Sequence, residues 1–160
     1  MRRLSSLAVV AALFALASAA GAEDIHVKST VGTWKLNLAK SKTEAWNPRS
    51  QTRVYEDWGG GLLHMHYEGT NAQGNPTLSL AVGRVDGKEY PFLIRGAQAA
   101  YTQTFTPVDD RTIAFDVRAD GKTTETGTKT MAADGKSFAI TFKTNNKGEP
   151  SSAVLVFDKQ

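Results

Sequence analysis

The sequence predicts an all-β fold, an antiparallel barrel or sandwich of about ten short strands joined by tight turns. In most segments apolar and polar residues alternate with period two, which is typical of strands that bury one face. Asp-Gly pairs, which favour two-residue hairpin turns, occur at Asp86-Gly87, Asp120-Gly121 and Asp134-Gly135. No segment shows the periodicity of a long amphipathic helix, so a chain of antiparallel strands in one domain follows.

The first 22 residues have the pattern of a secretory signal peptide. Arg2 and Arg3 precede an apolar run from Leu7 to Leu16, which is too short to span a bilayer. Small residues follow, and we place the cleavage after Ala22. Removing 22 of the 160 residues leaves a mature domain of 138, residues 23–160. We therefore expect a periplasmic or secreted protein with no later membrane anchor.

The strands of the mature chain are predicted in order from this alternation. Trp34, Leu36 and Leu38 form the apolar face of the first strand, and Lys40 to Ser50 is a polar loop or one short helical turn. A turn at residues 59–61 joins the next two strands, and residues 95–100 have room for one helical turn. The further predicted strands are 52–58, 62–68, 77–85, 89–94, 101–106, 112–118, 123–131, 137–143 and 153–157.

Charge and cysteine content narrow the classes of function. The chain carries 19 basic and 16 acidic residues, and two of the basic ones, Arg2 and Arg3, belong to the signal segment. The mature charge is thus near zero, and basic residues are scattered among acidic ones, so we expect no nucleic-acid partner. The chain has no cysteine, which excludes disulfide scaffolds and thiolate chemistry. Export without cysteine fits a bacterial protein best.

The segment Val31-Gly32-Thr33-Trp34-Lys35-Leu36 resembles the G-x-W start of the calycins, the lipocalins and fatty-acid-binding proteins. The closing segment from Val156 to Gln160 also resembles the last strand of the fatty-acid-binding proteins. The whole chain is most similar to the lipocalin-like proteins that bacteria export. The resemblance implies a lipocalin-like, antiparallel up-and-down barrel of about eight to ten strands, with Trp34 as a structural plug at one end and a small lipophilic ligand inside.

Two departures limit what the resemblance implies. Fatty-acid-binding proteins place a helical lid after the first strand, whereas residues 40–50 are too short and polar for a helix pair. Their last strand carries an R-x-Y that grips the ligand carboxylate, and here those positions are Leu155 and Phe157. Fatty-acid binding is therefore not carried over.

His64, His66 and Glu68 alternate along one predicted strand and share a face. Two imidazoles and a carboxylate suit a zinc-like metal, or acid–base catalysis on a neutral ligand. The competing interpretation is a solvated exterior face on which Glu56 and His64 form a cross-strand pair. The apolar character of the opposite face favours this second interpretation.

An internal repeat argues for the first interpretation. The pattern T-N-x-x-G-x-P begins at Thr70 and again at Thr144, 74 positions later. The same shift superposes His64 and His66 on Phe138 and Ile140, which we expect to face inward. If the two units had equivalent facings, the histidines would line the interior.

The opposite face supplies the competing candidate site, formed by Arg53, Tyr55, Met65 and Tyr67. An arginine beneath two tyrosines suits a small anionic or aromatic ligand, although ordinary core packing with an arginine reaching outward explains the same pattern. We expect a carrier of a small lipophilic or aromatic molecule, without cofactor or metal. The alternatives are an isomerase, lyase or hydrolase of the same fold that uses His64 and His66, and a structural domain whose barrel is filled by side chains.

Overall fold

The computed structural model describes residues 25–43, 47–146 and 149–160, so the predicted signal segment lies outside the described residues. Within these ranges the chain is all-β with little helix, as predicted. The elements are β1 (Gly32–Leu36), a 3-10 turn η1 (Leu38–Lys40), β2 (Lys42–Thr43), β3 (Ser50–Asp57), β4 (Leu63–Thr70), β5 (Pro76–Gly83), β6 (Glu89–Ile94), β7 (Tyr101–Asp109), β8 (Thr112–Ala119), β9 (Lys122–Met131), β10 (Ser137–Asn146) and β11 (Glu149–Lys159).

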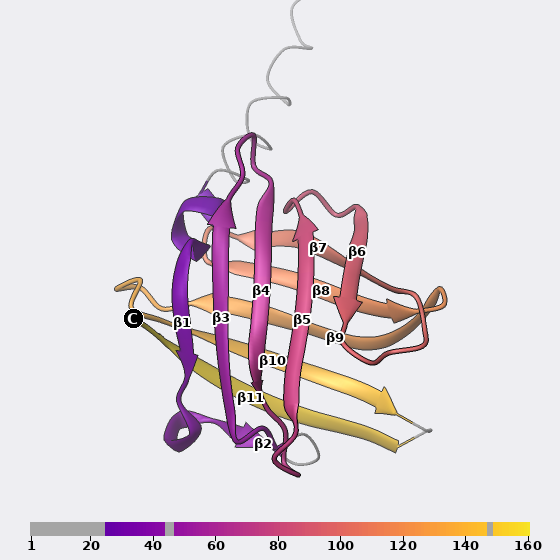
Figure 1. The fold of residues 1–160 in the computed structure, drawn as a ribbon. Helices are drawn as coiled ribbons and strands as arrows, with labels where there is room; N and C mark the ends of the chain where they lie inside the picture. Colours follow the sequence, from indigo (N-terminus) through magenta and orange to yellow (C-terminus); the bar gives the residue numbers. More distant parts are fainter. Residues whose placement is uncertain (1–24, 44–46, 147–148) are drawn as a thin grey trace, which may run out of the picture.

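The strands form one antiparallel barrel in which neighbours along the chain are neighbours in the sheet. The order runs β1-β3-β4-β5-β6-β7-β8-β9-β10-β11, and pairing of β1 with β11 closes it, while β2 adds to the edge of β11. Figure 1 shows β3, β4 and β5 upright in front of β8–β11, which cross behind them. The up-and-down barrel is thus a flattened one with two walls.

The predicted hairpin between β3 and β4 has the expected register. Glu56 pairs with His64 and Val54 with His66. The turn closes with a 2.8 Å hydrogen bond from the Trp58 amide to the Leu62 carbonyl, and the φ angles of all three glycines in the turn are positive, between 59° and 90°. Glycine adopts such angles without the steric cost that a Cβ imposes, so this sequence specifies the turn locally.

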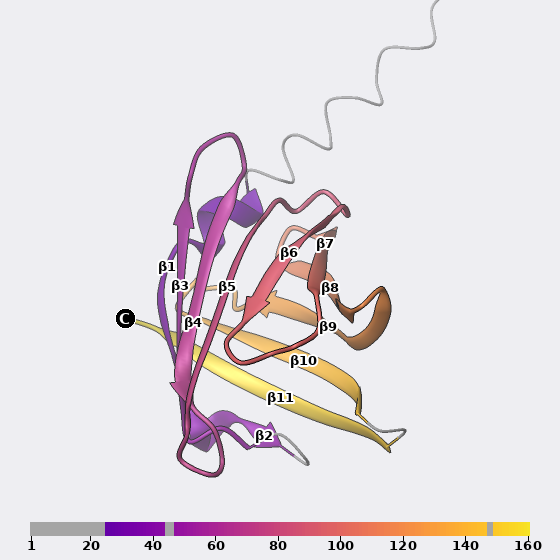
Figure 2. The same ribbon diagram turned by 45° about the vertical axis from the view of Figure 1, so that its right-hand side comes forward.

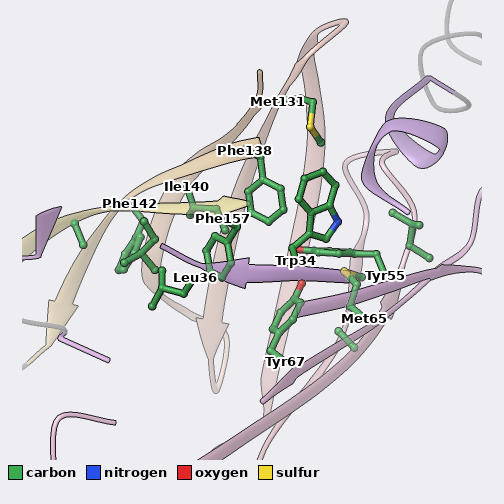
Figure 3. Close-up of a cluster of buried hydrophobic side chains, with 14 of the residues drawn as sticks. Trp34, Leu36, Tyr55, Met65, Tyr67, Met131, Phe138, Ile140, Phe142 and Phe157 are labelled. Atoms are coloured by element: carbon green, nitrogen blue, oxygen red, sulfur yellow. The ribbon is translucent and has the colours of Figure 1, made fainter. Parts of the chain in front are cut away.

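Trp34 lies at the centre of the aromatic core, as Figure 3 shows. It is completely buried, and its ring centroid is 4.8 Å from that of Phe138, which stacks in turn on Phe157 at 5.0 Å. Because alternate residues of β1, β10 and β11 point inward, aromatic and aliphatic groups from three strands meet here. Trp34 is thus a fully buried member of the aromatic core, and its role as a plug at one end of the barrel stays a prediction.

A short helical segment, residues 25–30, covers the same end of the barrel (Figure 2). Val27 and Thr30 are buried, and the Thr30 carbonyl accepts a 2.8 Å hydrogen bond from the Trp34 indole Nε1. This segment has too few residues to show helical periodicity, and the sequence analysis did not predict it. It closes one end of the barrel.

Three local predictions were wrong. Leu38 does not continue the inward face of β1, because the chain turns into η1 and leaves this side chain exposed. Residues 40–50 contain the two-residue strand β2 besides loop, while 44–46 lie outside the described residues. Residues 95–100 form a hydrogen-bonded turn from Ile94 to Ala97 instead of a helical turn. Among the described residues, no helix is long and apolar enough to cross a membrane.

Candidate functional site

The two walls of the barrel enclose a cavity of about 410 Å³. This volume lies within the usual range of small-molecule pockets, roughly 300–1,000 Å³. The described residues therefore do not fill the barrel interior completely, contrary to the filled-barrel alternative.

The wall made by β7–β11 presents its lining residues in cross-strand rows that follow from the strand register. The row nearest the β10–β11 hairpin is mostly polar and contains Gln103, Val117, Glu125, Thr144 and Ser151. The next row is aromatic, with Phe105, Phe115 and Phe142 around Gly127. The row nearest the helical segment of residues 25–30 contains Ile113, Lys129 and Ile140. The wall is thus polar at one end and aromatic in the middle, and at the other end a single amine lies between two isoleucines.

The opposite wall contains all four residues of the predicted ligand site. Arg53, Tyr55, Met65 and Tyr67 line the cavity from β3 and β4, where Arg53 pairs with Tyr67 and Tyr55 with Met65. The sequence predicted this grouping because the two faces of the β3–β4 hairpin differ clearly in polarity. The structure brings these four side chains together at the cavity.

Arg53 is held between two rings inside the barrel. Its guanidinium carbon lies 4.4 Å from the Tyr67 ring centroid and 4.8 Å from that of Phe157. Its Nε donates a 2.8 Å hydrogen bond to the Gln51 side-chain carbonyl. Cation–π contacts with these two rings and the hydrogen bond to Gln51 restrict the position of the guanidinium. A positive charge is therefore positioned in advance of any ligand.

Glu125 and Lys129 were missed by the sequence analysis, although both line the cavity from β9. They alternate with threonines along β9, so both faces of the strand carry polar side chains and the sequence gives no apolar face to mark the interior. A bulge opposite Val117 and Arg118 also turns Thr124 toward the cavity. The usable signal was Gly127, which lies between the two charged residues on the same face of the strand.

Gly127 is required by the packing of the aromatic row. A Cβ at this position would lie 2.3 Å from the Thr141 carbonyl oxygen and 2.8 Å from both Phe115 Cζ and Phe142 Cβ. The missing side chain lets Phe115 and Phe142 approach the backbone of β9, with Glu125 and Lys129 on either side of the glycine.

Burial shifts the ionisation of three cavity groups. Desolvation raises the pKa of Glu125 to about 7, with the nearby charge of Arg53 opposing the shift. Desolvation, followed by repulsion from Arg53, lowers the pKa of Lys129 to about 7. Burial raises the pKa of Tyr67 well above its ordinary value, and Tyr55 adds to this while Arg53 opposes it. In each case the low-dielectric interior disfavours the charged form.

Lys129 also connects the cavity to the helical segment of residues 25–30. Its Nζ donates a 2.5 Å hydrogen bond to Thr30 Oγ1 and lies 4.9 Å from the Tyr55 ring centroid. His26, buried in the same helical segment, has a lowered pKa because of its burial and of the Lys129 charge. The closed end of the cavity is therefore lined by an amine with hydroxyl and aromatic neighbours.

His64, His66 and Glu68 lie outside the barrel and do not line the cavity. His64 pairs with Glu56 at 3.0 Å and stacks on Trp58 at 4.4 Å, and His66 lies 3.6 Å from Glu68. The exterior interpretation is thus correct. The inference from the repeat was wrong, since Phe138 and Ile140 face inward while their counterparts face outward. Among the described residues, no three acidic, histidine or cysteine side chains form a metal-binding group.

The fold is a closed, antiparallel up-and-down β-barrel with an interior cavity. No known family model matches the chain, and no curated protein sequence matches it. Among solved structures, the zebrafish ileal bile acid-binding protein complexed with cholic acid is similar at a TM-score of 0.53 and 9% identity, covering 82% of this chain and 99% of that one. EF1p2_mFAP2b bound to DFHBI is similar at a TM-score of 0.48 and 11% identity, covering 83% and 95%. The likeness to the bile acid-binding protein shows the fold alone.

Proposed function

We propose that this chain is an exported small-molecule-binding barrel that holds a small lipophilic or aromatic ligand. The observation that carries the proposal is the cavity of about 410 Å³, which has an aromatic middle and a few polar groups toward its ends. Burying the apolar body of a ligand against Phe105, Phe115 and Phe142 supplies the main gain in free energy. The few polar groups orient it.

Two of these polar groups favour a ligand with a hydrogen-bond acceptor or a negative charge. Gln103 is 4% exposed and lines the cavity, yet its Nε2 has no hydrogen-bond partner. A buried donor without a partner costs about 1–3 kcal/mol, which a ligand acceptor would offset. Arg53 offers a positioned positive charge on the other wall. The expected ligand is therefore lipophilic with at least one acceptor group.

Uptake of an environment-sensitive dye tests the cavity. Anilinonaphthalenesulfonate and the neutral dye Nile red should bind the wild-type protein saturably. Ser79 lines the cavity from β5, whereas its neighbour Leu80 does not. Ser79→Trp should therefore weaken binding of both dyes by about tenfold or more, equivalent to about 1.4 kcal/mol, and Leu80→Trp should not. Binding that does not saturate, or that ignores Ser79→Trp, would contradict the proposal.

Comparing the charged dye with the neutral dye tests the role of Arg53. Arg53→Met should weaken the sulfonate dye several-fold more than it weakens Nile red, because only the first carries a negative charge. Equal effects on the two dyes would show that Arg53 only packs against the aromatic rings.

Export is supported by the amino-terminal pattern of the sequence. Expression of the full chain in a Gram-negative host, followed by amino-terminal sequencing of the periplasmic protein, should give a mature start at Glu23. Recovery of an uncleaved chain from the cytoplasm alone would contradict export without affecting the cavity.

A further inference from the structure

We propose that Lys129 is a covalent attachment site at which the barrel captures a lipophilic aldehyde as an imine. This inference rests on the proposed function, since the aldehyde must first enter the cavity. It adds a reaction to binding and names a chemical class of ligand, a carbonyl compound with an apolar body.

The placement of the amine carries the inference. Lys129 lines the cavity at its closed end, beneath the helical segment of residues 25–30. In the part of the chain that the structure describes, no carboxylate oxygen lies within 4.0 Å of its Nζ, whose neighbours are Thr30 Oγ1 and the rings of Tyr55 and Phe138. A lysine that serves only to balance charge needs an acidic partner, and this one has hydroxyl and aromatic neighbours instead.

The same surroundings make the amine a nucleophile. An ammonium group cannot attack a carbonyl, and a surface lysine is almost wholly protonated at neutral pH. Desolvation and a neighbouring cation are the two means by which enzymes free a lysine for such attack, and Lys129 has both, the cation being Arg53. Its pKa of about 7 leaves a large fraction of the amine neutral.

The reaction balances without any further reactant. The lone pair of Nζ attacks the carbonyl carbon, a proton moves from nitrogen to oxygen, and a carbinolamine forms. The carbinolamine then loses one molecule of water, and a carbon–nitrogen double bond remains. The aromatic row next to Lys129 covers the product, and exclusion of water from this region slows the reverse hydrolysis.

The strand geometry also limits the shape of the aldehyde. Glu125 lies four residues from Lys129 on the same strand, so the Cα atoms of the polar row and of Lys129 are about 13 Å apart. Phe115 and Phe142 lie against Gly127 between these two positions and line the cavity there. An elongated, flat aldehyde, aromatic or polyunsaturated, fits such a passage best.

Reductive trapping with cinnamaldehyde tests the proposal. The mature protein is incubated with the aldehyde and cyanoborohydride near pH 7, and the intact mass and the tryptic peptides are measured. We expect one adduct, heavier by the aldehyde less one oxygen atom, located on Lys129. Lys129 should react at least tenfold faster than exposed lysines such as Lys143. Lys129→Met should remove this adduct, and Lys143→Met, on the outward face of β10, should leave it unchanged.

Cinnamyl alcohol, which has the same body without the carbonyl, separates the two proposals. If the alcohol displaces the bound dye but the aldehyde labels Lys129 no faster than surface lysines, the imine proposal is wrong and the binding barrel remains. If the dye does not bind to the wild-type protein at all, the proposed binding function itself is wrong. Peptide mapping of the wild-type adduct decides the site even if Lys129→Met does not fold.

Discussion

Trp34 shows at the scale of one residue how a single side chain connects several parts of the barrel. Its ring packs on Phe138, its Nε1 donates to the Thr30 carbonyl, and Lys159 Nζ lies 5.1 Å from its ring centroid. The indole thus joins β1, β10, the chain end and the helical segment. Few other side chains are large enough to fill this space and also supply a donor.

Replacing Trp34 by phenylalanine should cost about 2 kcal/mol of unfolding free energy, because it removes the donor to a buried carbonyl and leaves space in the core. Chemical denaturation measures the change. The matched control is Trp58→Phe. Trp58 is 57% exposed on the outer face of the β3–β4 hairpin, and this change should stay within about 0.5 kcal/mol. Similar costs for both variants would contradict the plug role of Trp34.

At the scale of the element, β9 is a strand with polar residues on both faces, and one of these faces lines the cavity. Gly127 brings the strand against β10, and the aromatic side chains of β8 and β10 close over it. The charged groups on either side of the glycine then lie in the cavity wall. The strand contributes chemistry to the interior because its neighbours supply the apolar surface.

Gly127→Ala tests this packing. A Cβ would lie 2.3 Å from the Thr141 carbonyl oxygen, so β9 and β10 must separate, and we expect a loss of about 1–3 kcal/mol. Thr126→Ala, an outward position on the same strand, should cost less than about 1 kcal/mol. Thermal unfolding of both variants, with dye affinity as a second readout, checks the difference. If Gly127→Ala left the stability unchanged or raised it, the neighbouring side chains and β10 would have to move aside at little cost, which would contradict this interpretation.

At the scale of the whole molecule, the interior holds charges that the fold does not fully neutralise. Arg53, Lys129 and Glu125 face one cavity, and burial moves the pKa values of the last two toward neutrality from opposite directions. Buried ionisable groups of this kind make stability depend on pH through proton linkage.

The sign of this dependence differs between the two groups. Between about pH 4.5 and 7 the folded chain holds a proton on Glu125 that the unfolded chain has lost, so its contribution to stability falls as pH rises. Between about pH 7 and 10.5 the unfolded chain holds a proton on Lys129 that the folded chain lacks, so its contribution rises with pH. Together the two groups give a minimum near pH 7.

Two variants separate these contributions. Relative to Glu125→Gln, the wild-type protein should lose stability from pH 4.5 to 7. Relative to Lys129→Met, it should gain stability from pH 7 to 10.5. Because one pKa unit corresponds to about 1.4 kcal/mol, each difference should reach on the order of a few kcal/mol. Denaturant unfolding across this pH range measures both, and parallel curves for wild type and variants would contradict the burial of these groups.

About half of the candidate site follows from the sequence. Arg53, Tyr55, Met65 and Tyr67 were grouped correctly because Leu63, Met65 and the tyrosines mark one face of the hairpin as apolar, while the histidines and glutamates mark the other as polar. The register of Glu56 with His64 followed from the three-glycine turn. The second wall, with Gln103, Glu125 and Lys129, was not found.

The sequence by itself determined the antiparallel strands, most of their turns and which residues share a face, because period-two alternation and Asp-Gly turns act over a few residues. Only the tertiary structure decided which face of β9 lies inside, since threonines on one face and charges on the other give no local preference. It also decided that repeated segments face opposite ways and that residues 25–30 cover the barrel end. These outcomes depend on closing β1 against β11, a contact between segments far apart in the chain, and on the surface that this closure buries.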